Sequence, residues 1–244
     1  MNNTPEQHPF GLSVVLHLLP GVLTGIAFFL LGPFVKQSNL PPFMALCIAD
    51  VVVLFPCVYA YLYIQGSKRT GHFSLDGLIP YREKLGWRQY LIFVPVVFLA
   101  SGLLVVSLSF VSNFLRTSLF AWWPAMYDIG ADLSTYHKST LIVCYIINFL
   151  VITVMAPITE EIYFRGYLLP RLSRFGLWAI PINSILFALF HVWSPWMAVA
   201  RAVGLIPLIF VAQTKRNIYI GMIAHMLVNS LDVLTGVMLI MRLP

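Results

Sequence analysis

Long apolar stretches separated by short polar turns make up most of the chain. Seven such stretches occur, at residues 11–35, 41–64, 90–112, 139–173, 177–193, 197–213 and 217–241. A helix of about 20 apolar residues crosses the hydrocarbon core of a bilayer, so most of these stretches are long enough to span it. The pattern predicts an all-α fold: a multi-pass transmembrane bundle of about seven to eight helices, with residues 1–244 forming a single membrane domain.

Three of the stretches depart from a simple span. Residues 139–173 form a long stretch that becomes more polar after Pro157, so we expect a helix that kinks at this proline and continues. Residues 177–193 and 197–213 are short for full spans, and we expect tilted or partial helices there. The sequence has no apparent internal repeat, which disfavours the inverted-repeat transporter folds.

Composition agrees with a membrane protein. The 244 residues are 59% apolar and 10% charged, whereas soluble domains are about 45–50% apolar and about 25% charged. No long basic run occurs, so nucleic acid is not an expected partner, whereas membrane lipid is. The cysteines lie in apolar stretches without a Cys-x-x-Cys pair, and we expect small buried side chains rather than redox or metal-binding groups at Cys47, Cys57 and Cys144.

Basic residues gather in alternate connections. The connections after the second, fourth and sixth stretches carry nine, namely Lys68, Arg69, Arg82, Lys84, Arg88, Arg171, Arg174, Lys215 and Arg216. The opposite connections carry three, namely Lys36, Arg116 and Lys138. The positive-inside rule then predicts an integral membrane protein with a cytoplasmic N-terminus. No basic residue precedes the first stretch, and that stretch is too long for a signal peptide, so we expect a retained span.

The connection 113–138 is rich in aromatic residues, with Phe120, Trp122, Trp123 and Tyr127 close together. Tryptophan and tyrosine concentrate at membrane–water interfaces. We therefore expect an interfacial connection that lies on the outer surface of the membrane. A lid over the substrate is the alternative.

Three separated polar residues are predicted to lie at one depth. Glu160 precedes the turn near Gly176 by about 15 residues, and His191 follows it by about the same number. In an antiparallel hairpin both residues then lie about 23 Å from the turn, at about 1.5 Å per residue. Asn229 lies about 20 Å beyond the next turn on the same membrane face. Residues 139–241 are therefore the predicted catalytic helices.

The spacing within each helix suggests how the polar side chains interact. Glu161 and Arg165 are four residues apart and can form an ion pair, which leaves Glu160 to face elsewhere. His225 and Asp232 share one helical face, so Asp232 could orient the histidine ring.

Three further positions, one aromatic and two polar, are expected to have structural roles. Phe187 lies one helical turn before His191 and is expected to form a wall beside it. His17 and Asp50 have no polar companions at matched depth, so they are expected to have structural roles.

At these positions the chain resembles the CAAX-processing and bacteriocin-processing family of intramembrane endopeptidases, which includes the type II CAAX prenyl proteases. Its three motifs, EExxxR, FxxxH and HxxxN, occur in order within residues 155–231. They stand here as Glu160-Glu161-Ile162-Tyr163-Phe164-Arg165, Phe187-Ala188-Leu189-Phe190-His191 and His225-Met226-Leu227-Val228-Asn229. The resemblance implies that Glu160 is the general base and that His191 shares its water. It further implies that Glu161 and Arg165 hold the helix geometry, and that His225 and Asn229 donate to the oxyanion.

Whether a metal takes part is left open by the sequence. No cofactor is firmly implied, but the family is often labelled metalloprotease. Glu160, His191 and His225 could supply the three protein ligands of a catalytic zinc, with water in the fourth position. Such a site would use the residues otherwise assigned as base and oxyanion donor, and no HExxH helix is present. A metal-free water activated by glutamate is slightly favoured.

The sequence therefore predicts an intramembrane endopeptidase that cleaves a peptide bond near the cytoplasmic side of the membrane. Its substrate would be a peptide or protein, either prenylated or membrane-embedded, and the sequence does not name it. A proton-coupled transporter is one alternative, because membrane carboxylates and histidines also form proton relays. A non-catalytic membrane scaffold is another.

Overall fold

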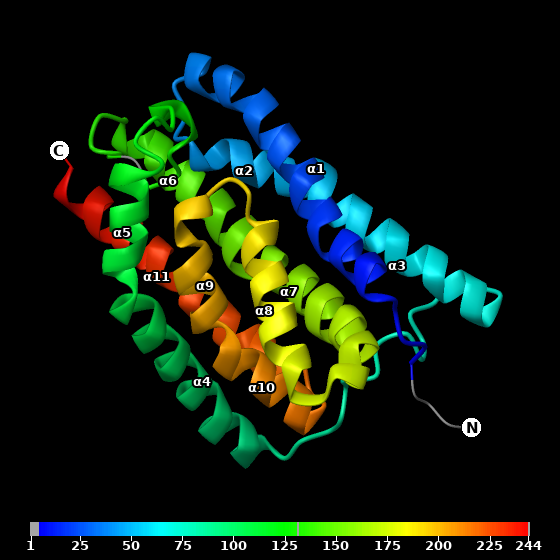
Figure 1. Cartoon of the computed structure of the whole chain (residues 1–244). Helices are drawn as coiled ribbons and strands as arrows, with labels where there is room; N and C mark the ends of the chain where they lie inside the picture. Colours follow the sequence, from blue (N-terminus) through cyan, green and yellow to red (C-terminus); the bar gives the residue numbers. More distant parts are fainter. Residues whose placement is uncertain (1–4, 131, 244) are drawn as a thin grey trace.

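The computed structural model describes residues 5–130 and 132–243, and within these ranges the chain forms helices and no strand (Figure 1). The first half contains α1 (Phe10–Gln37), α2 (Phe43–Ala49), a π-helical turn η1 (Asp50–Leu54), α3 (Phe55–Thr70), α4 (Trp87–Ser107), α5 (Ser109–Ser118) and η2 (Ala125–Tyr127). The second half contains α6 (Lys138–Asn148), η3 (Phe149–Met155), α7 (Ala156–Glu160), η4 (Glu161–Leu168), η5 (Leu169–Trp178), α8 (Ala179–Phe190), η6 (Pro195–Met197), α9 (Ala198–Gly204), α10 (Ile206–Lys215) and α11 (Tyr219–Arg242). The predicted all-α class is confirmed.

Five helical segments among the described residues are long and apolar enough to cross a membrane: Phe10–Gln37, Phe43–Thr70, Trp87–Ser107, Lys138–Phe190 and Tyr219–Arg242. Pro195–Gly204 and Ile206–Lys215 form a pair of helices bent by 43°, which has the apolar length of a broken span or a re-entrant loop. The predicted multi-pass bundle is therefore confirmed, and the short stretch 197–213 forms this bent pair.

One long segment accounts for two of the predicted stretches. Lys138–Phe190 is continuous in helical geometry except at Gly176, where φ is 56° and ψ is −127°. A positive φ of this kind suits glycine, which has no Cβ. Helix α8 runs back against η5 and η4, which continue α7 (Figure 1), and Asn183 Nδ2 of α8 donates to Phe164 O of η4 at 3.1 Å. The predicted hairpin is therefore present.

The expected kink at Pro157 takes the form of a widened turn. The π-helical turn η3 ends two residues before Pro157, and the helix then continues. Proline has no N–H to donate to the preceding turn, and its ring crowds the carbonyl there. Ile152 O accepts a hydrogen bond at 2.9 Å from the Asn229 side chain of α11. Because Pro157 cannot donate to the preceding turn, Ile152 O is free to accept this hydrogen bond from another helix of the site.

The basic connections lie together at one end of the bundle, at the lower right in Figure 1. The loop between α3 and α4 is bound to the turn before α11, because Ile218 N donates to Tyr81 O at 3.0 Å and Asn217 Nδ2 to Glu83 O at 2.8 Å. His8 N donates to Arg171 O at 3.2 Å near the other basic turn. The membrane side that this end faces stays a prediction.

The aromatic connection packs at the other end of the bundle. Tyr127 OH donates to Phe29 O of α1 at 3.1 Å, and its ring fills the space that a Cβ at Gly32 would occupy. The Trp123 ring packs against Trp196 of η6, in the connection between α8 and α9, with centroids 5.4 Å apart. The connection therefore lies over the end of the bundle to which α8 leads, while its interfacial role stays a prediction.

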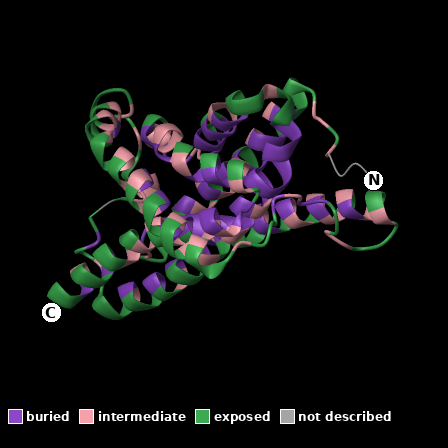
Figure 2. Ribbon diagram, turned by 90° about the horizontal axis from the view of Figure 1, so that it is seen from below, coloured by how far each residue is buried: buried purple, intermediate pink, exposed green. Residues whose placement is uncertain are grey.

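Burial follows the expectation for a bundle in lipid. Figure 2 shows buried residues gathered in the centre of the molecule and exposed ones along the outer helices. On α4, Val94 and Val97 are buried, whereas Leu91, Leu99 and Leu103 are each at least 65% exposed. A largely apolar exposed face of this kind suits contact with lipid, which supports an integral membrane protein.

Candidate active site

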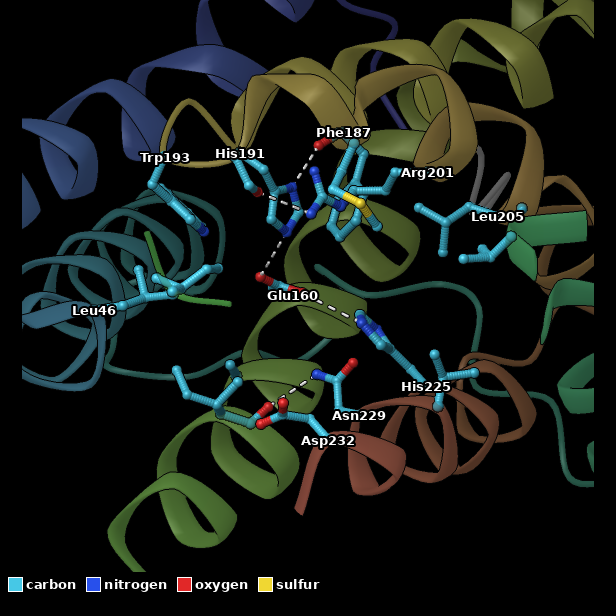
Figure 3. Close-up of a pocket in the computed structure, with 18 of the residues that line it drawn as sticks. Leu46, Glu160, Phe187, His191, Trp193, Arg201, Leu205, His225, Asn229 and Asp232 are labelled. Atoms are coloured by element: carbon cyan, nitrogen blue, oxygen red, sulfur yellow. Dashed lines mark hydrogen bonds and ion pairs between the residues drawn. The ribbon is translucent and has the colours of Figure 1, made fainter. Parts of the chain in front are cut away.

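Glu160 lies at the end of α7 with one carboxylate oxygen towards each of two histidines (Figure 3). Its Oε1 lies 3.9 Å from His191 Nε2, and its Oε2 lies 3.8 Å from His225 Nε2. Glu160 is only 6% exposed. The carboxylate therefore lies between the imidazole of a residue just beyond α8 and that of a residue in α11.

His191 lies just beyond the C-terminus of α8 rather than inside a helix. Helix α8 ends at Phe190, and the His191 backbone has φ −83° and ψ 62°. His191 still contacts Phe187, the first residue of the FxxxH motif, because its Nδ1 lies 2.9 Å from Phe187 O. A carbonyl can only accept, so Nδ1 carries the proton and the Nε2 lone pair faces Glu160. The Phe187 ring packs against the histidine with centroids 4.8 Å apart, as expected for a wall.

Glu161 orients His225, and this differs from the sequence expectation. Its Oε1 lies 3.1 Å from His225 Nδ1. The residue proposed for that role, Asp232, instead accepts from Asn148 Nδ2 at 3.4 Å. Asp232 shares the helical face of His225 but lies about 10 Å further along α11, whereas Glu161 reaches the ring from the packed helix η4.

The predicted ion pair between Glu161 and Arg165 is present, with Oε1 and Nη1 3.1 Å apart and both side chains fully buried. The Arg165 guanidinium carbon also lies 4.1 Å from the centroid of the Phe187 ring. Removing one partner of such a pair leaves an uncompensated buried charge. Glu161 therefore holds both an arginine and a histidine in place.

Asn229 completes the predicted layer. It lines the same cavity as Glu160, His191 and His225. One amide hydrogen is used for Ile152 O, and an amide group has a second one to donate. The residues predicted to lie at one depth therefore line one cavity, while the roles of the individual residues stay predictions.

The cavity has a volume of about 520 Å³ and receives residues from most of the bundle. Among its apolar walls are Leu46, Phe187, Trp193 and Leu205. It extends to Arg116 and Asp128 of the aromatic connection, which form an ion pair. The site therefore opens towards the end of the bundle that carries this connection.

Sequence reasoning missed Arg201 on α9. Its Nη2 donates to Ser194 Oγ at 3.0 Å, and its buried Nη1 has no hydrogen-bond partner among the described residues. Figure 3 shows it beside His191 at the cavity wall. The available signal was its position as the single charged residue of the apolar stretch 197–213.

Of the two residues expected to be structural, only His17 is clearly so. His17 Nδ1 lies 2.6 Å from Ser13 O, and Asn183 Nδ2 lies 3.0 Å from its Nε2. Both ring nitrogens are thus satisfied away from the cavity. Asp50 by contrast lines the cavity.

The site residues do not fit a metal ion as they stand. Zinc bonds to nitrogen and oxygen are about 2.0–2.2 Å long, which places tetrahedral ligand atoms about 3.3 Å apart. The carboxylate–imidazole distances of 3.9 and 3.8 Å exceed this. Within residues 5–130 and 132–243, no group of three His, Cys, Asp or Glu side chains is arranged to hold a metal.

Comparison with known families gives one match. Residues 142–231 match the family model described as "Type II CAAX prenyl endopeptidase Rce1-like". The match covers somewhat more than a third of the chain, and over this segment the chain is similar to the Rce1-like family. No curated protein and no solved structure shows significant similarity to the chain.

The match to the Rce1-like model confirms the predicted resemblance to the type II CAAX prenyl protease family. The matched segment contains every residue predicted for the site, from Glu160 to Asn229. It supports a CAAX-type intramembrane protease in general, and a membrane-associated peptide as the general kind of substrate.

Proposed function

We propose that this protein is an intramembrane endopeptidase in which Glu160 activates water beside His191 for attack on a peptide bond. The observation that carries the proposal is the Glu160 carboxylate with one oxygen towards each imidazole, 3.9 and 3.8 Å away. A buried carboxylate between two histidines, at the wall of a cavity, is suited to moving a proton.

The attacking water would lie between Glu160 Oε1 and His191 Nε2. Both atoms are acceptors, so they would take the two hydrogens of one water and leave its lone pairs free. With hydrogen bonds of about 2.8 Å, a separation of 3.9 Å subtends about 90° at the water oxygen. That angle is close to the angle of water itself, so a single water fits between the two atoms.

Glu160 then acts first as base and afterwards as acid. It accepts a proton as the water oxygen bonds to the carbonyl carbon and a tetrahedral oxyanion forms. When the carbon–nitrogen bond breaks, the same proton passes to the leaving nitrogen, so the products are a carboxylic acid and an amine. No further reactant is needed.

The oxyanion would be stabilised from α11. Asn229 has a free amide hydrogen, and His225 donates from Nε2 when both ring nitrogens are protonated. Donors fixed in a water-poor site stabilise such an intermediate strongly. Glu161 and Arg165 lie behind this face and would act as positioning residues, because they fix the ring of His225.

The side of cleavage depends on orientation. Glu160 lies 16 residues before the turn at Gly176, or roughly 24 Å from the basic end, in a hydrocarbon layer about 30 Å thick. Along the same segment Glu160 lies 22 residues after Lys138, or roughly 33 Å, so it lies well inside the helix rather than close to either end. Cleavage near the cytoplasmic side and a cytoplasmic basic end both stay predictions.

The proposal is tested with Glu160→Gln in lipid discs. The substitution keeps shape and hydrogen bonding but removes the base, so turnover of a fluorogenic peptide should fall about 10²–10⁴-fold while the melting temperature is retained. Glu83→Gln, on an exposed loop, is the matched control. Product masses must show hydrolysis of a peptide bond. Full activity of Glu160→Gln would rule out the mechanism and favour the transporter alternative.

A further inference from the structure

A second cluster of polar side chains lines the cavity on the side away from the basic end. It consists of Asp50 from η1, Asn148 from α6 and Asp232 from α11. Asp50 is 3% exposed and Asn148 is 2% exposed, whereas Asp232 lies exposed at the rim. The proposed reaction uses none of the three.

The cluster has more hydrogen-bond acceptors than donors. Asn148 Nδ2 donates to Asp232 Oδ2, and this is the one hydrogen bond within the described cluster. The buried Oδ1 atoms of Asp50 and Asn148 have no hydrogen-bond partner among the described residues. No described lysine or arginine forms an ion pair with either aspartate. Buried acceptors without a donor are costly, so a donor supplied from outside would be bound favourably.

The three side chains come from elements that pack against one another. Helix α2, which runs directly into Asp50 at the start of η1, packs against α6, and α6 packs against α11. Asn148 touches Asp232 directly. Figure 3 shows Asp232 on the far side of Glu160 from Arg201. The cavity therefore has the positive Arg201 on one side of the proposed base and the Asp232 carboxylate on the other.

The distance from the proposed reaction centre fits an extended peptide. Asp232 lies seven residues beyond His225 on α11, or about 10 Å. Asn148 lies twelve residues before Glu160, or at most about 18 Å. An extended chain advances about 3.3–3.6 Å per residue. The cluster is thus about three to five residues from the bond that would be cleaved.

We propose that Asp50, Asn148 and Asp232 form a substrate subsite for a cationic group, such as a lysine side chain, about three to five residues from the scissile bond. The inference rests on the proposed proteolytic function. An ammonium group offers three N–H donors to the unpaired carboxylate and amide oxygens. An inorganic cation fits less well, because no three described His, Cys, Asp or Glu residues are arranged as metal ligands.

The test compares fluorogenic peptides that carry lysine or norleucine at each of the six positions on either side of the cleaved bond. At the matching position, kcat/KM for lysine should exceed that for norleucine by about tenfold or more, as expected for a partly desolvated charge pair. Asp50→Asn and Asp232→Asn should each move this ratio towards one. Asp76→Asn, on an exposed loop, is the matched control and should keep the ratio. The melting temperature of each variant shows whether it is folded, and Asp232→Asn at the exposed rim serves if Asp50→Asn unfolds.

The outcomes separate this subsite from the proteolytic function. Cleavage with no lysine preference at any position would overturn the subsite and leave the protease. If no peptide is cleaved, anisotropy of labelled lysine and norleucine peptides on the Glu160→Gln protein decides. Tighter lysine binding that Asp232→Asn abolishes would support the subsite and count against the protease, and equal binding would overturn both. A melting temperature raised by Na⁺ or Ca²⁺ but not by peptide charge would assign the cluster to an inorganic cation instead.

Discussion

Glu161 Oε1 lies 3.1 Å from both Arg165 Nη1 and His225 Nδ1, so the second carboxylate of the glutamate pair connects two helices. The first carboxylate faces the cavity, and the second faces the protein interior. Adjacent residues on a helix point about 100° apart, which is why one sequence pair can supply a reacting group and its support.

Glu161→Gln is expected to destabilise the fold. Gln leaves the buried Arg165 charge uncompensated, which costs about 3–5 kcal/mol for a buried pair. Thermal unfolding in lipid discs should show a lower melting temperature, and peptide turnover should fall as well because His225 loses its support. Glu83→Gln should change neither value. An unchanged melting temperature for Glu161→Gln would show that the ion pair is not structural.

Asn229→Ala is expected to lower kcat by about 10²–10³-fold if the amide donates to the oxyanion. The substitution also removes the bond to Ile152 O, so the melting temperature is measured in parallel. A loss of stability without a loss of kcat would assign Asn229 to helix packing alone. Asn113→Ala, on an exposed face of α5, is the control.

Removal of metal is expected to leave activity intact. The atoms around Glu160 are too far apart for a zinc site as they stand, so protein dialysed against a chelator should keep its kcat. Metal content is measured on the same sample by mass spectrometry. Activity that is lost with the metal and restored by zinc would reassign Glu160, His191 and His225 as ligands and leave another group to serve as base.

Orientation is tested by cysteine labelling in intact cells, in a variant without the native cysteines. Under the positive-inside rule, Ser67→Cys at the basic end should resist an impermeant reagent, whereas Ser134→Cys at the other end should react. The reverse pattern would place the basic end outside and the 113–138 connection in the cytoplasm.

Much of the site could be predicted because helices fix distances along the chain. The level shared by Glu160 and His191 follows from helical rise and one hairpin turn, and the pair Glu161–Arg165 follows from their spacing. Neither prediction needs knowledge of which helices touch.

Contacts between helices could not be predicted in the same way. The partner of His225 was assigned within its own helix, but the ring turns towards η4, and Asp232 turns towards α6. The sequence predicts a structural role for Asp50 because no polar residue of another stretch matches its depth, yet Asp50 lines the cavity. Which neighbour a side chain meets depends on the rotation of each helix in the bundle, and apolar sequence on all sides gives little information about that rotation.

The π-helical turn η3 also sets the angular relation between the two halves of the long fourth helix. On an uninterrupted α-helix, Asn148 and Glu160 would be twelve residues apart and point about 120° away from each other. A π-helical turn contains about one residue more than an α-helical turn, which takes back about 100°. Both residues can therefore line one cavity. Deleting a single residue between Phe149 and Met155 would keep every motif in the sequence and yet turn Asn148 away from Glu160. A sequence alignment that ignores the extra residue of this turn would therefore misplace Asn148 relative to Glu160.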